Sequence, residues 1–238
     1  MNTPYGLPIL DNCVICKLRT AGFFCDLPQP TLMDLQKIKH ASVHPAGSIL
    51  FVEGQDPRGV FLICTGRVKL SLNSRDGKTL IVRLAQPGDV LGLRSTISHA
   101  PYELTAETLQ PCQVEFIRAD DFLKFLHTHG DACLSAATQL SEQCNTAYET
   151  IRSLGLTHSV SERVARLLLE WSEDGEQTKD GIRVTVALTH EEIAQLVGTT
   201  RETVTRTLSD FRKRKIAELR GSSLVILDRN ALQGLLAA

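Results

Sequence analysis

The chain has 238 residues, a formal net charge of −1 and a charged fraction of 22%, values typical of a globular protein with one large or two ordinary domains. A charge so close to neutral argues against diffuse binding to nucleic acid, so any such contact should be confined to a local patch. No apolar run reaches the length of a membrane span, and the N-terminus lacks a secretion signal. We therefore expect a cytoplasmic protein that does not enter the membrane.

The N-terminal segment, residues 1–30, shows little regular pattern but contains three of the seven cysteines. Cys13 and Cys16 form a C-x-x-C pair, which places two thiolates close enough to share one metal ion, and Cys25 follows. Because the cytoplasm keeps thiols reduced, we expect metal ligands, redox thiols or small buried residues rather than structural disulfides.

Residues 31–40 (TLMDLQKIKH) predict an amphipathic helix. Its apolar side carries Leu32, Leu35 and Ile38. From Ala46 to Ile117, short apolar runs separated by glycines predict an antiparallel barrel or roll, with Asp76-Gly77 as a hairpin turn. The expected strands cover residues 48–52, 60–64, 68–72 and 80–84.

Residues 120–156 predict one long helix whose apolar positions alternate by four and three residues, as in a heptad seam. The seam consists of Cys133, Ala137, Leu140, Cys144, Ala147, Ile151 and Leu154. A single seam needs a partner, which is either a second copy of the chain or the chain's own roll. A further helix, capped by Ser159 or Ser161, is expected over Arg163–Trp171, followed by a loop at 173–181 and a strand at 183–188.

Residues 188–208 predict two helices joined by a tight turn. Thr189 and Glu192 have the spacing of a capping box, Gly198 suits the left-handed turn, and Thr200 can cap the second helix. Val204 and Leu208 form the apolar face of that helix, and the remaining face carries Arg201, Glu202, Thr205 and Arg206. Arginine can bind guanine through two hydrogen bonds and glutamate can accept from cytosine, so a DNA-reading helix-turn-helix is predicted. The alternative is a helical hairpin whose arginines are merely solvated.

Residues 201–220 hold seven basic side chains and three acidic ones, a local basic stripe suited to phosphates. The candidates for contacts with the DNA backbone are Thr189, Thr200, Arg212, Lys213 and Lys215. Gly221-Ser222-Ser223, followed by the apolar run 224–227, predicts the strand-turn-strand of a wing.

The run IAQLVGTTRETVTRTL (193–208) resembles the DNA-binding motif of the CRP/FNR superfamily of bacterial transcription regulators, and the resemblance extends from about Gly47 to the C-terminus. It implies an α+β fold with an N-terminal antiparallel β-roll of the cyclic-nucleotide-binding type, a long dimerisation helix and a C-terminal winged helix-turn-helix. The corresponding domains are 31–130, 131–158 and 159–238, after the cysteine-containing segment. A homodimer on palindromic double-stranded DNA, with RNA polymerase as a further partner, is implied.

Arg201, Glu202 and Arg206 match the three base readers of the cyclic-AMP-receptor branch, which implies half-sites similar to TGTGA. Members that bind cyclic AMP hold it with a glutamate and with an Arg-Ser or Arg-Thr pair. Here Leu93 stands at the position of the glutamate, and the later segment Pro101–Ala106 offers Glu103 instead of an arginine. A carboxylate would repel the phosphate, so cyclic AMP is not expected to bind, although the displaced Arg94 leaves an unusual site open.

Oxygen-sensing members resemble this chain in having three N-terminal cysteines and a fourth in the roll, on a strand bearing E-T-x-x-x-C. The run Glu107-Thr108 to Cys112 matches that pattern. The resemblance therefore implies a [4Fe–4S] cluster held by Cys13, Cys16, Cys25 and Cys112. The spacing C-x2-C-x8-C departs from the C-x2-C-x5-C of those sensors, and the same thiols would suit zinc or a regulatory disulfide. Cys64, Cys133 and Cys144 are expected to be buried apolar residues without a role.

No nucleophile-and-base set or phosphate-binding glycine loop is present, so we do not expect an enzyme. A regulatory subunit with a nucleotide-binding-like roll is the alternative from another class, but the basic helix and wing after Thr189 argue against it. A DNA-binding protein that is competent without any ligand, or one with an unidentified small-molecule effector, also remains open.

Overall fold

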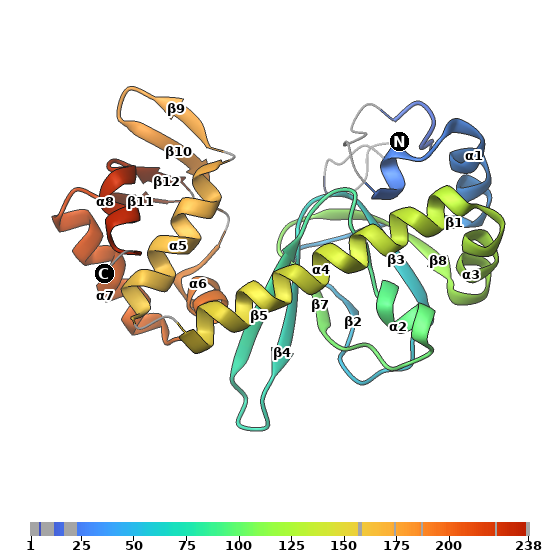
Figure 1. Cartoon of the computed structure of the whole chain (residues 1–238), viewed down its shortest axis with the longest axis horizontal. Coiled ribbons are helices and arrows are strands. Elements are labelled where there is room, and N and C mark those ends of the chain that lie inside the picture. Colours follow the sequence, from blue (N-terminus) through green and yellow to red (C-terminus); the bar gives the residue numbers. More distant parts are fainter. Residues whose placement is uncertain are drawn as a thin grey trace. The chain divides into compact units, whose positions relative to one another are not determined.

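The computed structural model describes residues 5, 12–16, 23–156, 159–173, 175–186, 188–221 and 223–236 (Figure 1). The chain divides into two compact units, Met1–Ala147 and Tyr148–Ala238. The division falls inside the long helix α4 (Gly130–Leu156), whereas the sequence analysis placed boundaries on either side of that helix. In the described part of the chain, no helix combines the length and apolar character needed to span a bilayer.

The first unit is a roll of two four-stranded antiparallel sheets, which confirms the predicted N-terminal β-roll. One sheet has the strand order β1-β8-β3-β6 and the other the order β2-β7-β4-β5. The bounds are β1 Lys39–His44, β2 Ile49–Phe51, β3 Gly59–Thr65, β4 Val68–Asn73, β5 Thr79–Ala85, β6 Val90–Leu91, β7 Thr105–Thr108 and β8 Cys112–Arg118. The predicted strands are thus present, and Gly77, at φ 77°, makes the expected turn between β4 and β5.

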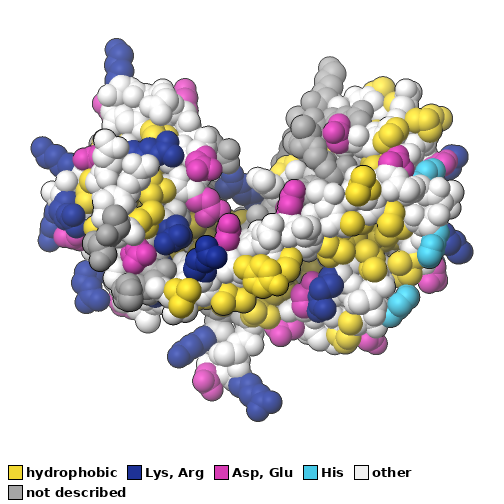
Figure 2. All heavy atoms as spheres, viewed as in Figure 1, with side chains coloured by type: hydrophobic (Ala, Val, Ile, Leu, Met, Phe, Trp, Pro, Cys, Tyr) yellow, Lys and Arg dark blue, Asp and Glu magenta, His cyan; other side chains and the backbone are white. Residues whose placement is uncertain are grey.

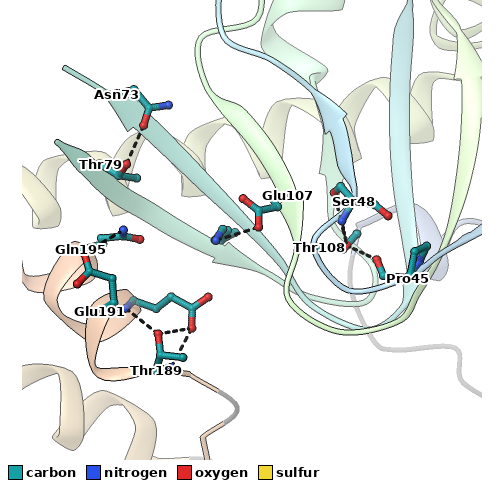
Figure 3. Close-up of polar contacts among 11 residues, drawn as sticks. Pro45, Ser48, Asn73, Thr79, Glu107, Thr108, Thr189, Glu191 and Gln195 are labelled. Atoms are coloured by element: carbon teal, nitrogen blue, oxygen red, sulfur yellow. Dashed lines mark hydrogen bonds and ion pairs between the residues drawn. The ribbon is translucent and has the colours of Figure 1, made fainter. Parts of the chain in front are cut away.

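Side chains of both sheets meet in a core between them, where the ring of Phe51 stacks on Tyr102 with centroids 4.0 Å apart. Thr108, at the end of β7, is hydrogen-bonded to the loop between β1 and β2. Its hydroxyl donates to the carbonyl of Pro45 at 2.6 Å and accepts from the backbone N–H of Ser48 at 2.9 Å (Figure 3).

A second core covers the outer face of the sheet β1-β8-β3-β6. It is formed by η1 (Phe23–Asp26), α1 (Gln29–Ile38), α3 (Ala119–Thr128) and the first turns of α4. These elements bury Phe24, Leu32, Leu35, Phe122, Ala132 and Ala136 against Val60, Leu62 and Ile117. Alternation along the strands therefore directs one set of side chains into the roll and the other set toward this second core.

Two element boundaries differ from the prediction. The first helix ends at Ile38, and Lys39–His44 is a strand, because its backbone pairs with β8. The helix predicted over 120–156 is broken into α3 and α4 at His129, which has an extended backbone (φ −120°, ψ 101°) and precedes Gly130, a weak helix former. A short helix, α2 (Leu93–Ser98), was not predicted.

The second unit packs helices around a sheet of order β11-β12-β10-β9. Its elements are α5 Val160–Glu173, β9 Glu176–Thr178, β10 Gly181–Thr185, α6 His190–Val197, α7 Arg201–Lys213, β11 Ala217–Arg220, β12 Ser223–Ile226 and α8 Arg229–Gly234. Ser159 caps α5, since its hydroxyl accepts from the N–H of Glu162 at 3.1 Å. The loop predicted over 173–181 is wrong in part, because Glu176–Thr178 pairs with β10 as a strand.

Candidate nucleic-acid interface

The helix α6 begins at the capping box that the sequence predicted. The side chain of Thr189 accepts from the backbone N–H of Glu192 at 3.2 Å, and the Glu192 carboxylate accepts from the backbone N–H of Thr189 at 2.8 Å (Figure 3). Ile193, Ala194 and Val197 are buried in the core of the unit. The first helix is thus fixed at its start by hydrogen bonds and along its inner face by apolar packing.

The turn between α6 and α7 depends on a residue with a left-handed backbone. Gly198 has φ 63° and ψ 50°, and its N–H donates to the carbonyl of Ala194. Glycine adopts this conformation without the steric cost that a Cβ would bring. Arg163 of α5 adds a side-chain contact, since its Nε–H donates to the carbonyl of Val197 at 2.8 Å. No local sequence signal marks this role of Arg163, because the contact joins residues 34 positions apart.

Thr200 caps α7, its hydroxyl accepting from the N–H of Thr203 at 3.3 Å. Val204, Leu208 and Phe211 point into the core, as the apolar spacing predicted for the first two. The opposite face carries exposed Arg201, Glu202, Thr205 and Arg206. With Ser209, Asp210 and Lys213, these four residues line one open hollow along the helix. The predicted base readers therefore share one solvent-facing surface.

The charges on this surface suit a polyanion with polar edges. Hydrogen bonds from its own backbone N–H and from the Thr200 side chain lower the pKa of Glu202 below its usual range, so its carboxylate is ionised and can accept hydrogen bonds. Arg212, Lys213 and Lys215 are exposed at the C-terminal end of α7 and beyond it. Thr189 and Thr200, the other predicted backbone contacts, are exposed at the two helix starts.

Thr205 is more constrained than the sequence suggested. Its hydroxyl donates to the carbonyl of Arg201 at 2.9 Å and lies 2.9 Å from Nδ1 of His190, the first residue of α6. Since the one hydroxyl hydrogen is already donated, Nδ1–H of His190 is the donor of the second bond. His190 therefore joins the N-terminus of α6 to the reading face of α7, a role that sequence spacing did not reveal.

The wing follows directly after these helices. β11 and β12 pair in register from Ala217 with Ile226 to Arg220 with Ser223, and Gly221 has φ 61°. The strand-turn-strand predicted around Gly221 is confirmed, with Ser222 outside the described residues.

Comparison with known proteins agrees with this geometry. Residues 162–235 match the model of the Crp-like helix-turn-helix domain, and residues 42–129 match that of the cyclic nucleotide-binding domain. The chain belongs to the CRP/FNR superfamily. It is therefore a DNA-binding transcription regulator, and the relatives found are transcription regulators rather than enzymes.

Two relatives of this CRP/FNR regulator illustrate the range of the family. The CRP-like cAMP-activated global transcriptional regulator of Mycobacterium tuberculosis is 29% identical over 216 residues, which are 90% of this chain and 96% of that protein. The anaerobic regulatory protein of Bacillus subtilis is 29% identical over 182 residues, 76% of each chain. In fold, the regulator is similar to the solved structure of FixK2 from Bradyrhizobium japonicum, with a TM-score of 0.74, 23% identity and coverage of 84% of this chain and 98% of that one.

In the CRP/FNR regulator, the four predicted metal ligands do not lie in one place. Cys13 packs against the second core, on the outer face of the sheet β1-β8-β3-β6. Cys112 is fully buried in the core between the two sheets, and its single S–H lies within hydrogen-bond reach of the carbonyls of Gln110 at 3.1 Å and Arg67 at 3.4 Å. Cys112 starts β8 on the side of Val114, and residues on that side of the strand face into the roll.

Cys64, which the sequence analysis treated as an apolar filler, lies nearer to the N-terminal thiols. Its thiol is 3.8 Å from Oε1 of Glu115, which also accepts from Nζ of Lys39 at 2.7 Å, and Lys39 is in turn hydrogen-bonded to Cys13. Burial and the Glu115 carboxylate both raise the pKa of the Cys64 thiol. The two cysteines of the seam, Cys133 and Cys144, are exposed on α4 rather than buried, which corrects the corresponding expectation.

At the positions where some family members hold cyclic AMP, this chain has a buried leucine and a glutamate that is already hydrogen-bonded and ion-paired. Leu93 is buried in the second core, where it leaves no acceptor for a ribose. Glu103 accepts a short hydrogen bond from the hydroxyl of Ser95 and lies 3.4 Å from Nε of Arg94. The nearby arginine is thus already paired with a carboxylate of the same segment.

The long helix α4 has a buried side and an apolar exposed side. Ala132, Ala136 and Gln139 face the roll. Of the predicted seam, Cys133, Ala137, Cys144 and Ile151 are exposed, and Leu140, Ala147 and Leu154 are half-buried. Leu134, Tyr148 and Leu156 are further exposed apolar side chains of α4, and hydrophobic side chains gather along the course of this helix (Figure 2).

Proposed function

We propose that the protein acts as a homodimer that binds palindromic DNA with TGTGA-like half-sites and regulates transcription together with RNA polymerase. The observation that carries the base-reading part is the shared exposed face of α7, which presents Arg201, Glu202 and Arg206. In this orientation the two guanidinium groups can each bind a guanine and the carboxylate can accept from a cytosine amino group. Half-sites about one helical turn apart would place two such helices in successive major grooves.

The polar residues around this face would set the position of the helix on the duplex. Thr189 and Thr200, at the helix starts, and Arg212, Lys213 and Lys215, at the other end, can contact phosphates on both sides of the groove. The side chains of these residues carry no base information, so they should contribute equally on any sequence.

The apolar exposed side of α4 supports the homodimer. Tyr148, Ile151 and Leu156 each leave about two thirds of their surface to solvent, with relative exposures of 64%, 66% and 73%. A seam of this kind on one long helix is buried when two copies pack as a coiled coil. The first unit of the same chain contacts α4 mainly through Ala132 and Ala136, and of the seam residues Leu140 packs partly against it.

The signal is proposed to be sensed by cysteines of the first unit rather than by cyclic AMP. The relative from Mycobacterium tuberculosis is cAMP-activated by its name. In this chain, however, Leu93 is buried, and the Glu103 carboxylate is already paired with Arg94 and hydrogen-bonded by Ser95. The relative from Bacillus subtilis is an anaerobic regulatory protein by its name, which fits a redox-linked signal better. An unidentified small molecule acting on the roll is the second candidate.

The test is a binding assay in which both halves of the proposal can fail. Fluorescence anisotropy with a TGTGA palindrome, the same palindrome with each half-site position changed, and a random duplex would measure the specificity. We expect at least ~10³-fold preference for the palindrome at physiological salt, and no heat of binding for cyclic AMP in calorimetry. Equal affinity for random DNA would contradict the half-site, and saturable cyclic AMP binding would contradict the sensor assignment.

A further inference from the structure

A hydrogen bond between two side chains joins the start of α6 to the exposed face of α7. Nδ1 of His190, the first residue of α6, lies 2.9 Å from the hydroxyl oxygen of Thr205, in the second turn of α7. The capping box at Thr189 fixes the backbone from which the imidazole extends. Val204 and Leu208 pack in the core of the unit, so α7 is held on its inner side. The two partners of this bond are therefore carried by helices that are each anchored separately.

The single hydrogen of the Thr205 hydroxyl is already in use. The hydroxyl donates to the carbonyl oxygen of Arg201, one helical turn earlier, at 2.9 Å. It accepts from Nδ1–H of His190, since this is the arrangement in which both contacts are hydrogen bonds. Because a hydroxyl group has one hydrogen, Thr205 has none left to donate to a base. The acceptors of the major groove, which are N7 and O6 of guanine, N7 of adenine and O4 of thymine, gain no hydrogen bond from it.

The methyl group of Thr205 is the part of the side chain that these two bonds leave over. Thr205 is exposed and lines the hollow along α7 together with Arg201, Glu202 and Arg206. Its hydroxyl is committed to the backbone of its own helix and to His190, so the Cγ2 methyl remains for a contact with DNA. The major groove presents one methyl group, the C5-methyl of thymine, and threonine methyl groups contact it in known complexes.

Thr207 provides an internal comparison on the same helix. Its hydroxyl also donates to the carbonyl one turn earlier, that of Thr203, at 2.9 Å. Thr207 is half-buried, however, and two residues further along an α-helix it lies on a different side of α7 from Thr205. The two threonines therefore share the bond to the backbone, whereas the bond from His190 and the place in the hollow belong to Thr205.

We propose that Thr205 recognises the thymine between the two guanines of a TGTGA half-site through contact between methyl groups, and that His190 is the positioning residue that holds Thr205 for this contact. Thr205 lies on α7 between Arg201 and Arg206, the two side chains proposed to bind guanines. The bond from His190 restricts rotation of the Thr205 side chain before DNA arrives, so less side-chain entropy is lost on binding. The inference rests on the proposed function for the identity of the half-site.

The first experiment removes only a methyl group from the DNA. Deoxyuridine lacks the C5-methyl of thymidine but keeps its hydrogen-bonding groups. Anisotropy titrations compare the TGTGA palindrome with palindromes that carry deoxyuridine at the third or at the first position of both half-sites. Uracil at the third position should weaken binding about fourfold for each half-site, or ~15-fold for the palindrome, which is the value of burying one methyl group twice. Uracil at the first position should change affinity little, and equal affinity for thymine and uracil at the third position would overturn the proposal.

A random duplex, titrated in parallel, separates this inference from the function on which it rests. A palindrome that binds no better than random duplex would refute the proposed function and this inference with it. A palindrome that is preferred over random duplex but is insensitive to uracil at its third position would refute this inference alone.

Substitutions of Thr205 test the same contact from the side of the protein. Thr205→Ser deletes the methyl group and keeps the hydroxyl, so it should lose the preference for thymine over uracil. Thr205→Val keeps the branched shape with its methyl groups and should retain that preference. Thr207→Ser makes the same deletion away from the hollow and should behave as the wild type. Retention of the full preference in Thr205→Ser would overturn the proposal.

The role of His190 is tested by restoring its N–H with another side chain. His190→Leu should lose most of the preference for thymine over uracil. His190→Asn should recover it, because the amide N–H of asparagine takes the place of Nδ1–H. Circular dichroism checks that both variants are folded. An unchanged preference in His190→Leu would overturn the positioning role.

A spectroscopic measurement tests the bond without DNA. Nitrogen-15 NMR of the histidine rings, at a pH where they are neutral, should show His190 with its hydrogen on Nδ1. The signal is assigned by its absence in His190→Asn. Thr205→Val removes the acceptor and should shift the ring toward the tautomer with its hydrogen on Nε2. A wild-type ring already in that second tautomer would overturn the assignment of His190 as the donor.

Discussion

The side-chain amide of Gln139, on α4, forms two hydrogen bonds with the backbone of Val90, on β6. The N–H of Val90 donates to Oε1 at 3.2 Å, and Nε2 of Gln139 donates to the carbonyl of Val90 at 2.8 Å. Because β6 is the edge strand of its sheet, Val90 has no neighbouring strand on its outer side. The Gln139 amide pairs with its backbone in place of such a strand. It joins the proposed dimer helix to the segment Gly88–Gly92, where some family members bind a nucleotide.

Replacing this amide should destabilise the first unit. Gln139→Leu would leave the buried N–H and carbonyl of Val90 without partners, at a cost of at least about 1–3 kcal/mol. Urea denaturation followed by circular dichroism would measure the change. Gln143→Leu, one turn further along α4 and half-buried, is the matched control and should change stability much less. Similar losses in both variants would mean that the Val90 contacts contribute little.

Two residues of α7 should separate base reading from phosphate binding. Arg206→Ala should cost about 1–3 kcal/mol of specific affinity and relax the base preference at one position of the half-site. Lys213→Ala should weaken binding to all sequences alike and lower the dependence of affinity on salt concentration. Both effects can be read from anisotropy titrations at several salt concentrations with specific and random duplexes. Equal losses on the two duplexes for both variants would contradict these roles.

The exposed side of α4 predicts that one charged substitution breaks the dimer. Ile151→Glu would place a carboxylate in the centre of an apolar interface, where it would lose its hydration without a partner. Sedimentation velocity should show a dimer for the wild type and a monomer for this variant. Glu142→Lys changes the charge at an exposed position half a turn away from Ile151 around the helix, and it should remain dimeric. A monomeric wild type would contradict the prediction directly.

Glu170, on α5, predicts a pH dependence of stability in the second unit. Partial desolvation by the surrounding atoms and the nearby carboxylates of Glu149 and Glu173 raise the pKa of Glu170 above its usual value, although the side chain still reaches solvent. The folded state therefore binds the proton of Glu170 more tightly than the unfolded state does. This protonation stabilises the folded state fully below the ordinary glutamate pKa, and the stabilisation is lost as the pH rises through the raised pKa of the folded state. Glu170→Gln should raise the melting temperature at pH 7 and have little effect at a pH below the ordinary value. An unchanged melting temperature at pH 7 would show that solvent screens the repulsion between these carboxylates.

The sequence by itself determined the elements whose signals are local. The capping box at Thr189, the left-handed turn at Gly198 and the apolar spacing of Val204 and Leu208 all involve neighbours within a few residues. Such contacts form in any context that allows a helix, so the exposed face of α7 that carries Arg201, Glu202 and Arg206 could be predicted. The family motif supported the same face independently.

Only the tertiary structure decided where segments distant in the sequence meet. Lys39 and His40 end the helix predicted over 31–40 but belong to β1, because β8 supplies their hydrogen-bond partners. Cys64 and Cys112 are both cysteines on apolar strands, and a strand places alternate residues on opposite faces. Pairing register and the bulge at Cys64 determine which of them faces the N-terminal thiols, and neither feature is encoded by residues near either cysteine.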